Sequence, residues 1–176
     1  LNPNTLEYED RKKLKSPAVE LAKQAKGTRN KMKALVSAKG DRAGELIWNV
    51  LKPALLYSAE LVGEIADDIV AIDQAMKWGF GWELGPCETW DAIGLRSSVE
   101  RMKEEGEIVP NWVLEFLEAG NESFYKQDNG EVYFYDNGEY KKQAFNPKEI
   151  NIKRLKDVNR VIKKNSGASL IDIGDG

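Results

Sequence analysis

The chain has 176 residues, of which 41% are hydrophobic, enough for one packed domain or for one domain with an appendage. Its net charge of −3 argues against nucleic acid as the main partner. It contains no histidine, which excludes a Ser-His-Asp triad, a histidine acid–base pair and a histidine metal site.

The single cysteine, Cys87, excludes an internal disulfide and a cysteine metal cluster, and we expect a reducing, cytoplasmic environment. No apolar stretch is long enough to span a membrane. The glycines of GFGWELG have the wrong spacing for a dinucleotide-binding loop. The chain begins at Leu1 without an initiator methionine, so we expect it to be a piece of a longer protein.

The first two predicted helices form the start of a helical domain. Ser16-Pro17 is typical of a helix N-cap followed by proline at the first helical position, and this helix is expected to end at Gly27. A second helix is expected from Thr28 to Gly40, where the next glycine stops it.

A long third helix is predicted from the cap residue Asp41 to Ile65. Pro53 removes a backbone donor inside it and crowds the preceding turn, so we expect a kink there. The helix is apolar on more than one face, which predicts that it is the most buried one. Its apolar positions include Leu46, Ile47, Val50, Leu51, Leu55 and Leu61.

Residues 67–94, DDIVAIDQAMKWGFGWELGPCETWDAIG, hold three of the five tryptophans of the chain. They predict an amphipathic helix that begins at Asp67, a break at Gly79 and Gly81, and a second helix that begins at Pro86. The apolar residues of these two helices are Ile69, Ile72, Ala75, Met76, Cys87, Trp90 and Ile93. Aromatic rings at helical spacing usually belong to a core, and that interpretation stays open beside a contact surface at this corner.

Two further helices complete a helical domain over residues 1–120. The helix predicted over residues 96–105 is highly charged and is expected to lie at the periphery, with Val99 and Met102 pointing inward. The other is predicted from Pro110 to Gly120. Its inward side chains are expected to be Trp112, Val113, Phe116 and Leu117.

The pattern changes to strands in residues 121–146, which alternate aromatic and polar side chains around two Asp-Asn-Gly sequences. Asn-Gly between strand-like runs predicts hairpins, because both residues tolerate a positive φ. We predict a three-stranded meander with strands at residues 123–127, 131–135 and 139–143.

The aromatic side chains of this meander have two interpretations. They can form a platform on which bases stack. In an acidic chain, a sheet that lays Phe124 and Phe134 against the helices explains them better.

Residues 147–167 are predicted to be a linker with a short extended entry at Ile150 and Ile152 and a helix over residues 154–164. Basic side chains in the last turn suit the negative end of that helix. Residues 168–173 are predicted to be a strand that is cut off before its partners, inside a last segment of residues 168–176.

The stretch of residues 67–94 resembles the signature of the C-terminal helical domain of 3-hydroxyacyl-CoA dehydrogenases. That signature has an acidic helix start, an Ile-Asp-x-Ala-Met run, a glycine-rich turn, and Gly-Pro-Phe-Glu before an Asp-x-x-Gly end. The matching residues are Ile72-Asp73, Ala75-Met76, Gly79, Gly81, Gly85-Pro86, Glu88, Asp91 and Gly94. Cys87 stands where the family usually has Phe.

The resemblance implies a mainly α fold and a parent enzyme in which a Rossmann domain, absent here, binds NAD and carries a His–Glu pair. The helical domain of the family closes the active-site cleft and makes dimer or inter-repeat contacts. It opens with an Asn-Arg pair, and counting back from Pro53 places Trp48 at that Asn, with no Arg at Val50. This departure implies a second, non-catalytic copy of the domain, although a shifted register leaves Asn49 open as a substrate contact.

The tail VIKKNSGASLIDIGDG resembles the junction into an enoyl-CoA hydratase domain in fused dehydrogenase/hydratase proteins, and the resemblance implies that residues 168–176 are the first strand and turn of that domain. The resemblance implies that the parent chain also contains Rossmann and hydratase domains and acts on acyl-CoA in fatty acid β-oxidation, and it leaves a homodimer open as the assembly. This chain by itself is expected to bind neither NAD nor metal and to be inactive.

The predicted functional surface is a wall of the acyl-CoA cleft or an interdomain contact. Its residues are Trp48, Trp78, Phe80, Trp82, Gly85, Pro86 and Trp90. A different class of function, a stand-alone helical module that only dimerises, remains as the alternative. A third possibility uses Glu88 and Asp91 as paired carboxylates, which lie three residues apart on a helix.

Overall fold

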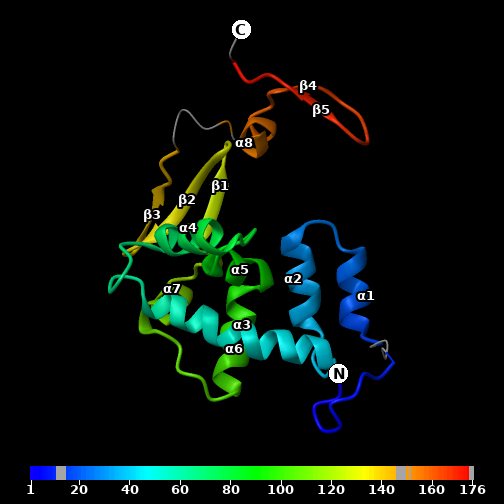
Figure 1. Ribbon diagram of the computed structural model, residues 1–176. Coiled ribbons are helices and arrows are strands. Elements are labelled where there is room, and N and C mark those ends of the chain that lie inside the picture. The colour runs from blue at the N-terminus through cyan, green and yellow to red at the C-terminus, as the bar shows by residue number, and fades with distance from the viewer. Residues whose placement is uncertain (11–14, 146–149, 151, 175–176) are drawn as a thin grey trace.

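The computed structural model describes residues 1–10, 15–145, 150 and 152–174. In these residues the fold is mainly α, as predicted, with eight helices and two small antiparallel sheets (Figure 1). The helices are α1 (Pro17–Gln24), α2 (Thr28–Ser37), α3 (Arg42–Glu60), α4 (Ile69–Phe80), α5 (Pro86–Ile93), α6 (Leu95–Glu104), α7 (Asn111–Glu118) and α8 (Ile152–Asp157). The strands are β1 (Tyr125–Asp128), β2 (Glu131–Asp136), β3 (Glu139–Lys142), β4 (Val161–Lys164) and β5 (Ser169–Ile171).

The predicted caps of the first and third helices are both present, and they are joined. Ser16 accepts a hydrogen bond from the Val19 amide at 3.2 Å and so caps α1. Its hydroxyl donates to the carboxylate of Asp41 at 2.8 Å. Asp41 in turn caps α3 by accepting from the amides of Ala43 and Gly44. These bonds lower the pKa of Asp41, and one polar cluster thereby fixes the starts of two helices.

Helix α3 is central, as predicted, but it ends at Glu60 rather than at Ile65, which is exposed. The chain turns after Leu61, whose carbonyl accepts from the amides of Ile65 and Ala66, and Gly63 adopts a positive φ of 80°. The buried face of α3 consists of Trp48, Leu51, Leu55, Leu56 and Ala59. The opposite face leaves Leu46, Val50 and Tyr57 exposed.

The corner predicted in residues 67–94 is present. Asp68 caps α4 by accepting from the Ala71 amide at 2.8 Å. The helix continues through Gly79, where a break was predicted, and ends before Gly81, whose φ of 68° forms a left-handed cap. A new helix, α5, begins at Pro86 as predicted.

Helix α6 buries Val99 and Met102, as predicted, so one face of this charged helix packs in the core. Its buried side chains are Leu95, Ser98, Val99 and Met102. Its other faces carry the charges seen in the sequence, and one of these, the Arg101 guanidinium, lies against the ring of Trp48 in α3. Helix α7 buries Val113, Phe116 and Leu117, as expected from its spacing.

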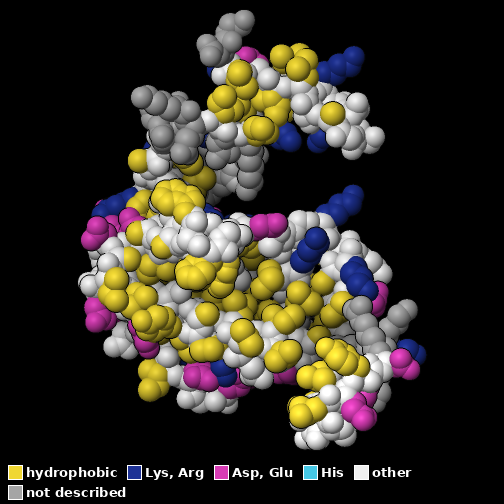
Figure 2. All heavy atoms as spheres, in the orientation of Figure 1, with side chains coloured by type: hydrophobic (Ala, Val, Ile, Leu, Met, Phe, Trp, Pro, Cys, Tyr) yellow, Lys and Arg dark blue, Asp and Glu magenta, His cyan; other side chains and the backbone are white. Residues whose placement is uncertain are grey.

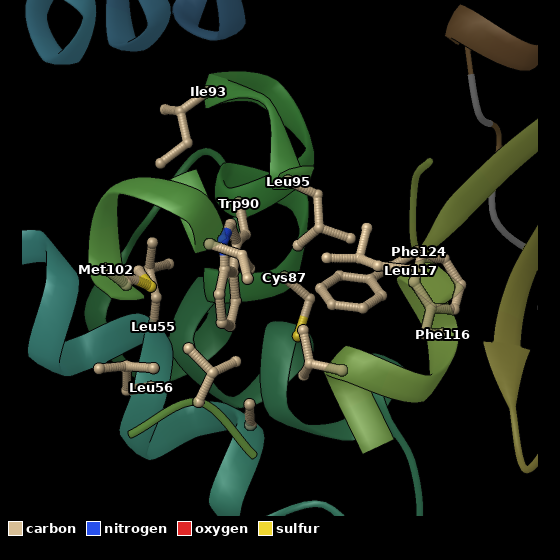
Figure 3. Packing of buried hydrophobic residues seen from close by; sticks show 14 of the residues in the cluster. Leu55, Leu56, Cys87, Trp90, Ile93, Leu95, Met102, Phe116, Leu117 and Phe124 are labelled. Atoms are coloured by element: carbon tan, nitrogen blue, oxygen red, sulfur yellow. The ribbon is translucent and has the colours of Figure 1, made fainter. Parts of the chain in front are cut away.

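Strands β1, β2 and β3 form the predicted antiparallel meander, in that order. Asn129 and Asn137 both have a φ of 47°, as the two Asn-Gly turns require. Phe124 and Phe134 are buried in the same cluster as the helical side chains, which confirms the prediction that the sheet packs on the helices. In Figure 3, Phe124 lies beside Phe116 of α7.

The prediction for the C-terminal region was wrong in its second half. Helix α8 ends at Asp157, Asn159 adopts a left-handed φ of 58°, and residues 161–164 form strand β4 instead of helix. Strand β5, which was predicted to lack a partner, pairs antiparallel with β4. Ile152 belongs to α8 rather than to an extended entry. Residues 146–149, at the start of the predicted linker, lie outside the described residues.

Figure 1 shows α8 and the β4–β5 hairpin beyond the three-stranded sheet, away from the bundle of α1 to α7. Within the described ranges, no helix has both the length and the apolar character needed to cross a membrane.

Candidate functional site

The residues predicted to form a contact surface divide into a buried group and an exposed group. Trp48, Gly85, Pro86 and Trp90 belong to the interior, whereas Trp78, Phe80 and Trp82 lie outside. Trp48 and Trp90 are 0% and 1% exposed, so in this chain their rings pack the core and present no outer surface.

The two buried indoles connect helices. Trp90 of α5 donates its Nε1 proton to the Ser98 hydroxyl at 2.6 Å, and its ring meets the ring of Phe124 edge-on at 5.9 Å. Figure 3 shows Trp90 in the middle of the cluster. Trp48 of α3 donates to the carboxylate of Glu105 at 2.8 Å, and the Arg101 guanidinium lies 4.5 Å from its ring centre. Both rings therefore hold the fold together.

The Asp73 carboxylate fixes the start of α5. It accepts hydrogen bonds from the amides of Cys87 and Glu88 at 2.8 and 3.0 Å, and from the Tyr125 hydroxyl at 2.8 Å. A Cβ atom on Gly85 would lie only 2.3 to 2.4 Å from atoms of Asp73. The glycine of the Gly-Pro signature is therefore required by the close approach of α4 to α5.

Glu88 and Asp91 have separate structural partners and do not form a pair of facing acids. Glu88 accepts from the Gly85 amide at 2.8 Å and from the Lys77 ammonium at 3.0 Å. Asp91 accepts from the amides of Phe124 and Tyr125 at 2.8 and 2.9 Å, and so joins α5 to β1. The arrangement assigns both acids to the packing of the corner.

Burial raises the pKa values of the acidic groups in this corner. It raises the pKa of Asp73 to about 6 and that of Asp91 to about 7, and the hydrogen bonds that each carboxylate accepts oppose this rise. Burial also raises the pKa of the Cys87 thiol and of the Tyr125 hydroxyl, so both are protonated at neutral pH. The buried carboxyl of Asp73 and the half-buried carboxyl of Asp91 therefore change charge close to neutral pH.

An apolar groove of about 570 Å³ lies between α2, α3 and the loop from α4 to α5. Trp82, which is 37% exposed, and Leu84 form its loop side. The exposed face of α3 forms the opposite side, and the hydrogen bond from the Thr28 hydroxyl to the Glu83 carboxylate is at the polar edge. The apolar lining includes Met32, Leu46, Ile47, Val50, Leu51 and Ala54. We call this the α3 groove.

Trp78 and Phe80 lie near the end of α4 and are 78% and 73% exposed. Large exposed rings are typical of contact surfaces. Figure 2 shows apolar side chains gathered over the helical part of the molecule. Asn49 is exposed on α3 and is not among the residues that line the α3 groove. Within the described part of the chain, no three acids or cysteines are grouped so that they can hold a metal ion.

No family model and no solved structure matches the chain. A protein of Bacillus subtilis (strain 168) named "Probable 3-hydroxyacyl-CoA dehydrogenase" is 61% identical to it over 175 residues. The predicted family resemblance is confirmed. The match covers 99% of this chain and 22% of the relative, so the chain spans about a fifth of the length of that dehydrogenase.

The residues that revealed the resemblance to the dehydrogenase are mainly structural. Asp73, Gly85, Glu88 and Asp91 lock α4, α5 and β1 together. Sequence reasoning missed the outer face of α3 as part of the site. A signal was available, because the apolar residues of α3 are too many for one buried face.

Proposed function

We propose that this chain is a helical segment of an NAD-dependent 3-hydroxyacyl-CoA dehydrogenase of fatty acid β-oxidation. It walls the acyl-CoA cleft and packs against other domains of the parent. NAD and the reacting groups belong to a Rossmann domain elsewhere in that chain, and the parent carries a hydratase domain and works in the cytoplasm. The 61% identity to a probable 3-hydroxyacyl-CoA dehydrogenase supports the activity proposed for the parent. The α3 groove is the observation that supports the acyl-binding role proposed for this segment.

The lining of the α3 groove suits an acyl chain. Leu46 and Val50 are 65% and 66% exposed, so their apolar surface is in contact with water when the groove is empty. Covering such surface gains about 25 cal/mol per Å², or about 0.8 kcal/mol for each methylene that leaves water. An acyl chain, which has no groups that need hydrogen bonds, is therefore bound more favourably as it lengthens.

The other domains of the parent are proposed to cover Trp78 and Phe80. These two rings lie on the outside of the same corner whose inside is locked by Asp73 and Asp91. A rigid support keeps exposed rings in fixed positions, which lowers the entropy lost on contact. The hydrogen bonds of Asp73 and Asp91 inside the corner thus support the exposed rings of Trp78 and Phe80 on its outside.

A kinetic test compares two charge insertions in the full-length parent. Val50→Asp places a carboxylate in the α3 groove, and Ile108→Asp places one at a residue that is 86% exposed outside it. We expect Val50→Asp to lower kcat/KM for NADH-dependent reduction of a long-chain 3-ketoacyl-CoA about tenfold, which corresponds to about 1.4 kcal/mol. Acetoacetyl-CoA is expected to react almost normally.

The control variant Ile108→Asp is expected to leave both substrates unaffected. Equal losses for long and short substrates with Val50→Asp, or no loss with either, would contradict the acyl role of the groove. The 176-residue chain alone is expected to show no reduction of acetoacetyl-CoA, because it lacks the reacting groups.

The alternative is a helical module that dimerises, and the exposed Trp78 and Phe80 are the observation that favours it. Sedimentation of the isolated chain distinguishes it: a stable dimer that dissociates in Trp78→Ala or Trp82→Ala supports the module. Trp90 is unsuitable for this test, since it is 1% exposed and its loss would damage the core.

A further inference from the structure

Helix α8 and strands β4 and β5 form one small unit beyond the three-stranded sheet (Figure 1). The Arg160 amide donates to the Leu155 carbonyl at 2.9 Å, and the Arg160 carbonyl accepts from the Asp172 amide at 2.8 Å. The Arg160 guanidinium also pairs with the Asp172 carboxylate at 2.7 Å. These bonds tie α8 to the hairpin, and we call the three elements together the C-terminal unit.

The C-terminal unit contacts the rest of the chain at the turn between β1 and β2. We propose that this contact is a joint that fixes the orientation of the C-terminal unit relative to the sheet and the helices. The joint lies outside the α3 groove, and the proposal goes beyond the proposed function.

The two Asn-Gly turns of the meander have the same kind of backbone but different surroundings. Gly130 and Gly138 have φ values of 76° and 95°, and each follows an asparagine with a φ of 47°. Gly138 is exposed, and an added Cβ atom there would have nothing within 4 Å. Gly130 is buried, and an added Cβ atom would overlap Cγ1 of Val158. The end of α8 therefore covers one turn so closely that the turn has no room for a side chain.

An ion pair lies beside this close contact. Glu131, the first residue of β2, accepts from the Arg154 guanidinium of α8 at 2.7 Å and lies 3.3 Å from the Lys142 ammonium at the end of β3. Burial raises the pKa of Glu131, but the bonds from Arg154 and Lys142 outweigh this effect and lower it, so the carboxylate is charged at neutral pH. The Arg154 guanidinium also lies 5.0 Å from the ring centre of Phe145. A planar guanidinium held by a carboxylate and a ring has little freedom to turn.

The two contacts together restrict rotation. Gly130 and Glu131 are neighbours in the turn, and Arg154 and Val158 are four residues apart, one helical turn along the same side of α8. A unit attached at two points cannot rotate freely about either one.

The hairpin of the C-terminal unit does not share the helical core. Its side chains Ile162 and Leu170 are 66% and 59% exposed. Burial of apolar surface therefore contributes little to the position of the hairpin, and a few specific contacts decide it. In the proposed parent, the same joint sets how any domain attached to this unit faces the helices; that extension rests on the proposed function, whereas the joint itself does not.

The test measures the distance between two spin labels in the 176-residue chain by double electron–electron resonance. The labels are attached through Lys33→Cys in α2 and Lys164→Cys in β4, both at exposed residues. The native Cys87 is 1% exposed, so we expect it to stay unlabelled.

Two test variants each have a matched control. Gly130→Ala is compared with Gly138→Ala, which strains the backbone of the other turn in the same way but meets no neighbour. Glu131→Gln is compared with Glu139→Gln, since Glu139 begins β3 and its side chain is 72% exposed. We expect one narrow distance distribution in the labelled chain and in both controls, and a distribution at least about twofold broader in both test variants.

Circular dichroism of each variant shows whether the helices stay folded. Broadening in Glu131→Gln but not in Glu139→Gln supports the joint even where Gly130→Ala fails to fold. A broad distribution in the labelled chain without further substitution, or equal widths in the test and control variants, would overturn the joint.

Discussion

Gly85 shows how the absence of one side chain sets the angle between two helices. The Cα, Cβ and Cγ atoms of Asp73 occupy the space where a larger residue would place its Cβ atom, and the Asp73 carboxylate accepts hydrogen bonds from the first free amides of α5. The conformation of Gly85 does not require glycine, since its φ is −71°. The close approach of Asp73 is what requires it.

Gly85→Ala is therefore expected to destabilise the chain by about 2 to 4 kcal/mol, because Asp73 must move and release the start of α5. Gly79→Ala is the matched control, since Gly79 lies inside α4 and an added Cβ atom there would have nothing within 4 Å. That control is expected to be neutral or to add up to about 1 kcal/mol of helix stability. Urea unfolding measures both values. Similar values for the two variants would show that Asp73 does not restrict this position.

The carboxyls of Asp73, which is buried, and Asp91, which is half-buried, predict an unusual pH dependence of stability. Their pKa values of about 6 and about 7 lie above the ordinary value of 3.8, so the folded chain binds protons more tightly than the unfolded chain. The stabilisation is complete below pH 3.8 and is lost as the pH rises through 6 and 7. Between pH 8 and pH 5 we expect the free energy of unfolding to rise by about 2 to 4 kcal/mol.

Asp91→Asn removes one of these two titrating groups. The variant is expected to be less stable at pH 5 but to show a flatter pH dependence, measured by urea unfolding at a series of pH values. Glu122→Gln, a change of an exposed acid near the start of β1, is expected to keep the wild-type slope. A wild-type slope in Asp91→Asn would refute the assignment to this carboxyl.

At the residue scale, the sequence predicted helix caps better than it predicted burial. Ser16 and Asp41 were placed correctly as caps and Pro86 as the first residue of α5, because helix starts depend on neighbours along the chain. Trp48 was expected on a contact surface, Trp90 either there or in the core, and both are buried. Their partners, such as Glu105 for Trp48, lie far away in sequence, so local spacing gives no sign of them.

At the scale of elements, helix α3 is joined to α6 by an ionic network around Glu105. Its carboxylate accepts from the Trp48 indole, the Lys52 ammonium and the Arg101 guanidinium at 2.8 to 2.9 Å. These contacts lower the pKa of Glu105 to about 2, against the opposing effect of burial. The Arg101 guanidinium also forms an ion pair with the Glu45 carboxylate of α3 at 2.7 Å. Helix α6 is therefore joined to α3 both at Glu45 and around Trp48.

Glu105→Ala is expected to destabilise the chain by about 1 to 3 kcal/mol, because the Trp48 indole and the Arg101 guanidinium lose a shared partner. Glu104→Ala is the neighbouring control, since Glu104 is 72% exposed and lies 4.0 Å from Lys39. Its effect is expected to be less than about 0.5 kcal/mol. Thermal unfolding at neutral pH compares the two, and equal effects would argue against the network as a link between α3 and α6.

The incorrect elements in the prediction have a common physical cause. The pattern of residues 154–164 fits a helix, but Asn159 takes a left-handed φ and the following residues pair with β5. A short apolar run such as Val161-Ile162 fits either a helix or a strand, and pairing with a neighbouring strand decides between the two. The meander was predictable because its Asn-Gly turns specify hairpins locally.

At the scale of the whole molecule, helices and sheet share one core, and the polar corner of Asp73 and Asp91 lies where they meet. The α3 groove and the exposed rings of Trp78 and Phe80 lie outside that core. The mainly α fold and the resemblance to a 3-hydroxyacyl-CoA dehydrogenase were predictable from local signals. The groove was not, because it forms between α2, α3 and a loop that are separated in sequence.

We propose that other domains of the parent enzyme cover the exposed rings of Trp78 and Phe80. Oxidative footprinting with mass spectrometry compares Trp78 in the isolated, monomeric chain and in the full-length parent, with the buried Trp48 and Trp90 as internal references. We predict that Trp78 is oxidised several-fold more slowly in the parent, while the two references stay slow in both. Equal oxidation of Trp78 in the two proteins would contradict this proposal.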